Sequence, residues 1–143
     1  MRISAKAEYA CIAMLELAAH HGDSQPVRIK TIADTHQIPQ RFLVQILLQL
    51  KGAGLVASIR GASGGYQLTR PPEKMSLADV IDVIDRTPAP RARAAAGTSS
   101  PVVLAVRSIW TELQMREHRF LSELTLADLV QRAQQPSAPS YQI

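Results

Sequence analysis

The chain has 143 residues, of which 46% are hydrophobic and 20% charged, and its formal net charge is +4 at pH 7. This is the size and composition of one folded domain, and it excludes global disorder; the single cysteine excludes a disulfide scaffold. No apolar run approaches the ~20 residues of a membrane span. The opening segment contains Lys6 and Glu8, where a signal peptide needs an apolar stretch. We therefore expect a cytoplasmic, soluble protein with no membrane partner.

The positive charge is concentrated in the first half of the chain. Residues 1–70 contain eight Lys or Arg against four Asp or Glu, whereas residues 71–143 contain eight of each. Between residues 28 and 70, six basic side chains accompany one acid, Asp34. Such an excess indicates a polyanionic partner if the basic residues fall on a nucleic-acid module. Otherwise it indicates only a solvated basic surface.

Apolar periodicity predicts three helices at the start of the chain. Apolar residues recur at steps of three and four over 3–20, 30–36 and about 40–52. Ser4 is a suitable N-cap for the first helix, and Gly22 is suited to its end. The expected inward residues of the third helix are Phe42, Leu43, Ile46, Leu47 and Leu50.

A change of period follows the third helix. Residues 55–60 and 66–69 are predicted strands, and the glycine-rich segment 61–65 is the turn of a hairpin. Gly61, Gly64 and Gly65 allow positive φ angles and a close approach to phosphates.

Three helices are predicted after the hairpin. Two capping-box patterns, at 76–79 and 125–128, predict helices that end near residues 86 and 134. A longer helix is predicted from Pro101 to about Leu121. The resulting organisation is a DNA-binding unit at 1–86, a mobile loop at 87–100 rich in Pro, Ala and Arg, a dimerisation helix and C-terminal helix at 101–134, and a frayed tail at 135–143.

The predicted element order is that of a winged helix-turn-helix, mainly α with a small β-hairpin wing. This module places its third helix in the major groove and its wing on the backbone or in the minor groove. Expected base-reading residues are Gln40, Arg41, Val44 and Gln45. Expected wing and backbone contacts are Arg2, Lys6, Arg28, Lys51, Arg60, Ser63, Gly64, Gly65 and Tyr66. Val44 could contact a thymine methyl group; packing within the module is the alternative for Val44 and Leu48.

Three segments of the chain resemble the Rrf-type (Rrf-two) family of bacterial transcription regulators. They are MRISAKAEYA, IADTHQIPQRFLVQIL and LKGAGLVASIRGASGGYQLTRPPEKMSLADVI. The resemblance covers residues 1–86 and continues in register over 101–130. It implies a homodimer whose long helices cross over each other, a palindromic operator and, in many members, a sensing iron–sulfur cluster.

The sequence departs from the cluster-bearing members of that family. Those members have three cysteines in the loop before the long helix, and thiolate is the usual iron ligand. This loop has no cysteine, and Arg107 stands where some members have a histidine ligand. We therefore expect no 2Fe–2S cluster and no metal, so that an effector would be a small molecule or a protein. The alternative is a cluster shared across the dimer axis by Cys11 and Glu8.

Cys11 lies on the apolar stripe of the first helix and is expected to be an inert, buried residue. The alternative is a redox thiol or an intersubunit disulfide. The histidines lack the spacing of metal ligands and are expected to be structural or solvent-facing. They are His20, His21, His36 and His118.

The long helix predicts a homodimer, because it has more apolar surface than one small domain can cover. Expected interface residues are Val102, Val106, Ile109, Trp110 and Leu113. The alternative is that this helix folds back on the first helix of its own chain.

No phosphate loop, nucleophile elbow or metal-binding helix pair is present, so an enzyme is not expected. We predict a regulator that binds double-stranded DNA sequence-specifically as a homodimeric repressor. The alternatives are a winged-helix protein-interaction module without DNA binding and a redox regulator that senses through Cys11.

Overall fold

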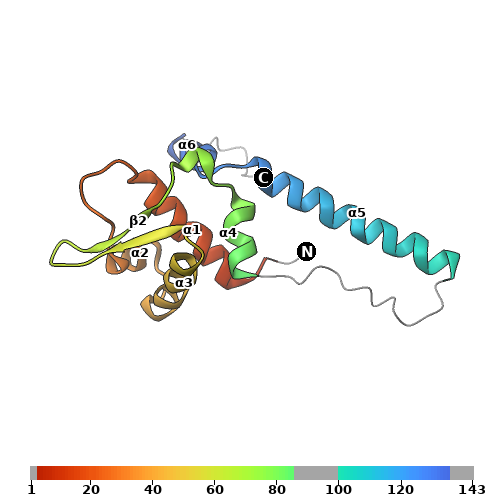
Figure 1. Cartoon of the computed structure of the whole chain (residues 1–143), viewed down its shortest axis with the longest axis horizontal. Helices are drawn as coiled ribbons and strands as arrows, with labels where there is room; N and C mark the ends of the chain where they lie inside the picture. The colour runs from red at the N-terminus through yellow and green to blue at the C-terminus, as the bar shows by residue number, and fades with distance from the viewer. Residues whose placement is uncertain (1–2, 86–99, 136–143) are drawn as a thin grey trace, which may run out of the picture.

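The computed structural model describes residues 3–85 and 100–135 (Figure 1). Arg2, nearly all of the loop expected at 87–100 and the tail from residue 136 therefore lie outside the described residues. The elements, in chain order, are α1 (Ala5–Ala19), α2 (Ile29–His36), α3 (Gln40–Gly52), β1 (Val56–Ile59), β2 (Gly65–Leu68), the 3₁₀ helix η1 (Pro72–Lys74), α4 (Leu77–Ile84), α5 (Pro101–Glu123) and α6 (Leu126–Gln134). The predicted winged helix-turn-helix is confirmed.

The core is built around α1, which contacts α2, α3, α4, α6 and β2. Its side chains at Ala7, Ala10 and Ala13 are fully buried, and their small size lets neighbouring elements approach closely. Ser4 is the N-cap, as predicted: its hydroxyl accepts from the N–H of Ala7 and donates to Asp85 Oδ1 at 2.6 Å. The end of α4 is thereby joined to the start of α1.

α3 presents one face to this core. Leu43, Ile46, Leu47 and Leu50 are fully buried, as predicted. The prediction for Phe42 was wrong, because its side chain is 40% exposed. Phe42 instead lies against Tyr9 of α1, with the ring centroids 6.1 Å apart. It lies at the margin of the inward stripe, where a neighbouring ring rather than the core covers it.

The wing is a two-stranded antiparallel hairpin in which Ser58 pairs with Tyr66. Val27, in the segment before α2, extends it by one bridge, since Val27 and Tyr66 exchange hydrogen bonds of 2.9 and 2.7 Å. Of the three glycines that allow a positive φ at this turn, Gly61 adopts one, at +112°. The other two, Gly64 and Gly65, are required by crowding: a Cβ there would lie 2.4 Å from the carbonyl oxygens of Ile59 and Val27, respectively.

Both predicted capping boxes are confirmed at the starts of α4 and α6. α6 packs into the same core as the first three helices, because Leu126 is fully buried there beside Met75. The N–H of Leu126 donates to the Met75 carbonyl at 2.8 Å, and the N–H of Leu77 donates to the Leu124 carbonyl at 2.9 Å. The chain therefore returns to the winged domain after α5.

α5 projects from the winged domain, with its N-terminal end farthest away (Figure 1). It contacts α4, and His118 hydrogen-bonds to Asp82 of that helix at 3.0 Å. No residue of α5 is buried. α5 thus does not lie along α1 in the single chain (Figure 1). Within 3–85 and 100–135, no helix is long and apolar enough to cross a membrane.

Candidate nucleic-acid interface

The exposed face of α3 is a stripe at the spacing i, i+3, i+4, i+7. Arg41, Val44, Gln45 and Leu48 make this stripe, and all four are exposed. It lies opposite the buried stripe, which has the same spacing from Leu43. Gln40, in the first turn, is exposed as well. The four residues predicted to read bases are therefore all accessible on one helix, which can present them to a groove.

The guanidinium of Arg41 stacks on the ring of Phe42. Its guanidinium carbon lies 5.0 Å from the centroid of the Phe42 ring, and that ring stacks on Tyr9. Stacking of a guanidinium on a ring restricts the side chain and leaves its N–H groups available for hydrogen bonds. This support was missed by the sequence analysis, which had placed Phe42 in the core.

The wing presents basic and polar groups at its turn. Arg60 and Ser63 are exposed, as a contact with the DNA backbone requires. Gly64 and Gly65 are half-buried, and glycine is needed at both positions because backbone carbonyl oxygens leave no room for a Cβ. Tyr66, expected among the wing contacts, is half-buried and packs against the core, so its ring supports the base of the wing.

Arg28 has a role that the sequence did not reveal. Its guanidinium donates a hydrogen bond to the carbonyl of Ala62, at the turn of the wing. Arg28 was predicted to contact phosphate directly. In the structure it ties the start of α2 to the wing, 34 positions away in sequence. The guanidinium has five N–H donors, so this bond leaves others for a phosphate.

The region from α3 through the wing contains no carboxylate. No Asp or Glu occurs between Asp34 and Glu73. Lys51, near the end of α3, and Lys6, in the first turn of α1, are exposed. On α2, Lys30 forms an ion pair with Asp34 at 2.9 Å. The positive potential of this surface is therefore uncompensated locally, as binding to a polyanion requires.

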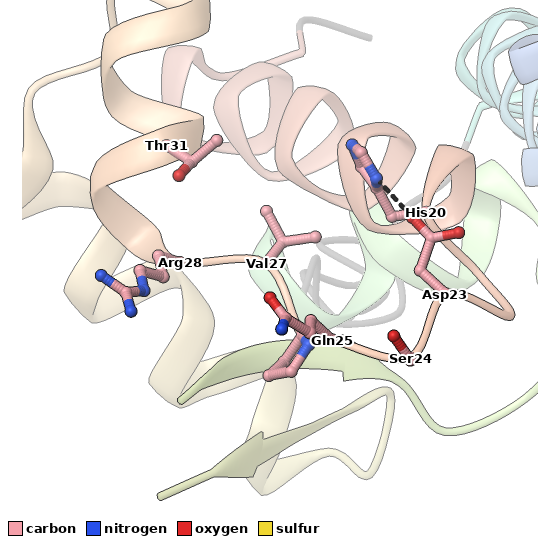
Figure 2. Close-up of a pocket in the computed structure, with 8 residues that line it drawn as sticks. His20, Asp23, Ser24, Gln25, Val27, Arg28 and Thr31 are labelled. Atoms are coloured by element: carbon pink, nitrogen blue, oxygen red, sulfur yellow. Dashed lines mark hydrogen bonds and ion pairs between the residues drawn. The ribbon is translucent and has the colours of Figure 1, made fainter. Parts of the chain in front are cut away.

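An open pocket of about 480 Å³ lies between the end of α1 and the start of α2 (Figure 2). His20 and Asp23 are joined on one side of it, and Arg28 lies on another. Glu16 accepts from His20 at 2.9 Å and from His36 of α2 at 2.7 Å. His36 therefore links α2 to α1, and His20 joins the end of α1 to the following loop, in agreement with structural roles.

The chain is similar to known regulators over nearly its whole length. Residues 3–132 match the Rrf2 family, described as iron-dependent transcriptional regulators. The chain belongs to the Rrf2 family. It is 36% identical to the HTH-type transcriptional regulator CymR of Bacillus subtilis over 135 residues, which are 90% of this chain and 89% of CymR.

Solved structures of Rrf2 regulators have the same fold. The structure of B. subtilis CymR aligns with a TM-score of 0.80 at 34% identity, covering 92% of this chain and 98% of that one. IscR of T. potens aligns with a TM-score of 0.78 at 31% identity, covering 99% and 96%. The chain is therefore a DNA-binding transcriptional regulator of the winged-helix type and not an enzyme.

Because the family is described as iron-dependent, the side chains of this chain that could bind iron are relevant. Cys11 is its one thiol, and burial, followed by the charges of Asp85 and Glu8, raises the pKa of that thiol to about 11. Among the described residues, no three His, Cys, Asp or Glu side chains lie where they could hold a metal ion. The segments outside that part of the chain contain none of these four residue types. The donor set of this chain does not fit a 2Fe–2S cluster.

Proposed function

We propose that this Rrf2 protein is a homodimeric repressor that binds a palindromic operator through α3 and the wing, without an iron–sulfur cluster. The observation that carries the proposal is the exposed stripe of α3. It combines Arg41, which suits guanine, with Gln45, which suits adenine, on a surface without carboxylates. A protein-interaction module would have no need of base-reading side chains on α3 and of Arg60 on the wing.

The apolar face of α5 supports the homodimer. Val102, Ile109 and Trp110 are 73%, 56% and 59% exposed, respectively, in the single chain. Val106 and Leu113 are exposed on the same helix, so all five residues predicted at the interface are uncovered. An apolar face of this length needs a partner, and a second copy of α5 supplies an equivalent one. A two-fold pair presents two α3 helices, which match two halves of a palindrome.

The single thiol supports cluster-free binding. Two chains together supply two thiols, whereas a 2Fe–2S cluster takes about four protein ligands, mostly thiolates. Burial raises the pKa of Cys11 to about 11, so the thiolate that binds iron is rarer at neutral pH than in an ordinary cysteine. Regulation of this protein would then depend on a small molecule or a protein partner.

Selection of bound DNA from a random pool tests the function. The purified full-length chain should enrich a palindrome. Arg41→Ala and Gln45→Ala should each lose ~1–3 kcal/mol of discrimination at one position of each half-site. Arg60→Ala should weaken binding about equally on all sequences and reduce the salt dependence by about one phosphate contact.

The matched control is Gln67→Ala, which changes an exposed polar residue of β2 that is not among the predicted contacts. The proposal is wrong if the pool yields no preferred sequence. The assignment of α3 alone is wrong if a preferred sequence emerges and both α3 variants keep the same preference and affinity.

A further inference from the structure

The exposed stripe of α3 contains two aliphatic side chains. Val44 is 39% exposed, and Leu48 is 56% exposed. On an ordinary surface helix, the face opposite the core is polar. Here Leu48 lies near the middle of that face, one turn after Val44 and seven residues after Arg41. Packing within the module therefore covers much of Val44, but it leaves more than half of Leu48 exposed.

The surroundings of the two side chains indicate what covers them. Val44 lies between Arg41 and Gln45, Leu48 follows one turn later, and no Asp or Glu occurs in the sequence from residue 35 to residue 72. A second copy of the chain is not the partner expected at α3. The apolar surface proposed to bind a second copy is on α5, at the opposite end of the molecule from the wing (Figure 1). The partner at α3 must therefore be anionic and must also offer small apolar groups at the spacing of one helical turn. In the major groove of DNA, the apolar group is the 5-methyl group of thymine.

We propose that Val44 and Leu48 recognise thymine methyl groups, so that each half-site contains two thymines whose methyl groups contribute to affinity. The inference rests on the proposed function, in which α3 enters the major groove. Side chains four residues apart have Cβ atoms ~5–6 Å apart, and base pairs follow one another every ~3.4 Å. The two methyl groups are thus expected one or two base steps apart.

The proposal also specifies the neighbours of these thymines. Arg41 is three residues before Val44, and Gln45 is three residues before Leu48. A guanine read by Arg41 is therefore expected next to the thymine read by Val44. An adenine read by Gln45 is expected next to the thymine read by Leu48. Specificity at the thymines comes from contact and exclusion of water rather than from hydrogen bonds.

The experiment replaces thymine by uracil, which removes the methyl group and keeps base pairing. Each thymine of the selected half-site is replaced singly, and the dissociation constant of the full-length protein is measured. Two replacements should weaken binding by roughly fourfold each, the effect of exposing one methyl-sized group. Replacements at other thymines should change it less than twofold.

Two variants assign the contacts. Val44→Ala should lose the sensitivity to uracil at one thymine, and Leu48→Ala should lose it at the other. Leu48→Met, which keeps an apolar side chain, should retain most of it. Gln49→Ala, on the edge of the same helix, is the matched control and should keep both sensitivities. Both truncated side chains are exposed, so the variants should fold, which circular dichroism verifies.

Three outcomes would overturn the proposal: selected half-sites without thymine, uracil replacements without effect, or alanine variants that weaken binding equally on thymine and uracil operators. In each case the Arg41→Ala and Gln45→Ala data decide separately whether α3 reads bases. The methyl contacts can therefore fail while the proposed function stands.

Discussion

Cys11 shows how burial limits the chemistry of one residue. Cys11 was expected to be buried, but it is half-buried: it packs against the margin of the core, near the carboxylates of Asp85 and Glu8. Burial first, and then the two charges, raises its pKa from 9.0 to about 11. The thiolate at neutral pH is therefore about a hundredfold rarer than for an ordinary cysteine. Both iron binding and oxidation require that thiolate.

We expect Cys11→Ser to bind the operator like the unchanged protein, before and after treatment with peroxide. Anaerobic incubation of the unchanged protein with iron and sulfide should give no stable visible absorption band, because the thiol stays protonated. As a control, the thiol should react with an alkylating reagent once the chain is unfolded in urea. A band that is present in the unchanged protein and absent from Cys11→Ser would contradict the expectation.

At the scale of elements, α1 and α2 are joined by a network of ionisable side chains. Glu16 of α1 receives hydrogen bonds from His20, at the end of its own helix, and from His36 of α2. Asp23, in the following loop, hydrogen-bonds to His20 at 2.8 Å. The bond to Asp23 raises the pKa of His20 above its ordinary value of 6.5, and Glu16 contributes in the same direction. Protonation of His20 therefore stabilises the folded state.

The contribution of His20 to the stability of the folded state should decrease as the pH rises. Because its pKa is raised in the folded state, the stabilisation is fully present below about pH 6.5 and is lost as the pH rises through the folded pKa. The Tm difference between the unchanged protein and His20→Gln should be larger at about pH 5.5 than at about pH 8. Thermal unfolding followed by circular dichroism measures it.

His21→Gln is the matched control for this prediction. In the part of the chain that the structure describes, the His21 side chain is exposed and makes no hydrogen bond or ion pair. Its Tm should follow that of the unchanged protein at both pH values. A difference for His20→Gln that stays constant, or grows towards high pH, would contradict the expected linkage.

At the scale of the whole molecule, the winged domain and α5 present two separate surfaces. The winged domain has a closed core, to which α6 contributes Leu126. α5 has no buried residue and holds an apolar face away from that core. The arrangement separates the surface proposed for a second copy from the surface proposed for DNA, so that both can be occupied together.

We expect the chain to be a dimer in solution, with twice its 15.6 kDa mass. Ile109→Glu and Leu113→Glu should give monomers, because each places a charge in the apolar contact. Operator affinity should then fall at least about tenfold, since the two half-sites are no longer bound by linked domains. Light scattering coupled to gel filtration measures the mass.

Thr111→Glu controls for the added charge, because residue 111 lies on the other side of α5 from Ile109. This variant should remain dimeric and bind the operator normally. A monomeric mass for the unchanged chain at micromolar concentration would contradict the dimer, as would glutamate variants that remain dimeric.

The sequence by itself determined the features that depend on neighbours within a few residues. The stripes of α3, the capping boxes of α4 and α6, the glycine turn of the wing and the apolar face of α5 all follow from local patterns in the sequence. That the face of α5 is uncovered was decided by the tertiary structure. The exposure of the residues proposed to read bases could be predicted for the same reason, because the face opposite a buried stripe must be exposed.

Only the tertiary structure decided the contacts between residues far apart in the chain. Asp85 binds Ser4 across 81 positions, and Arg28 reaches the wing across 34. Gly65 is required because the carbonyl of Val27 lies against it, and Phe42 lies at the margin of the core with its ring stacked on Tyr9. Each of these depends on the position of a second element, and local periodicity contains no information on how two elements approach each other.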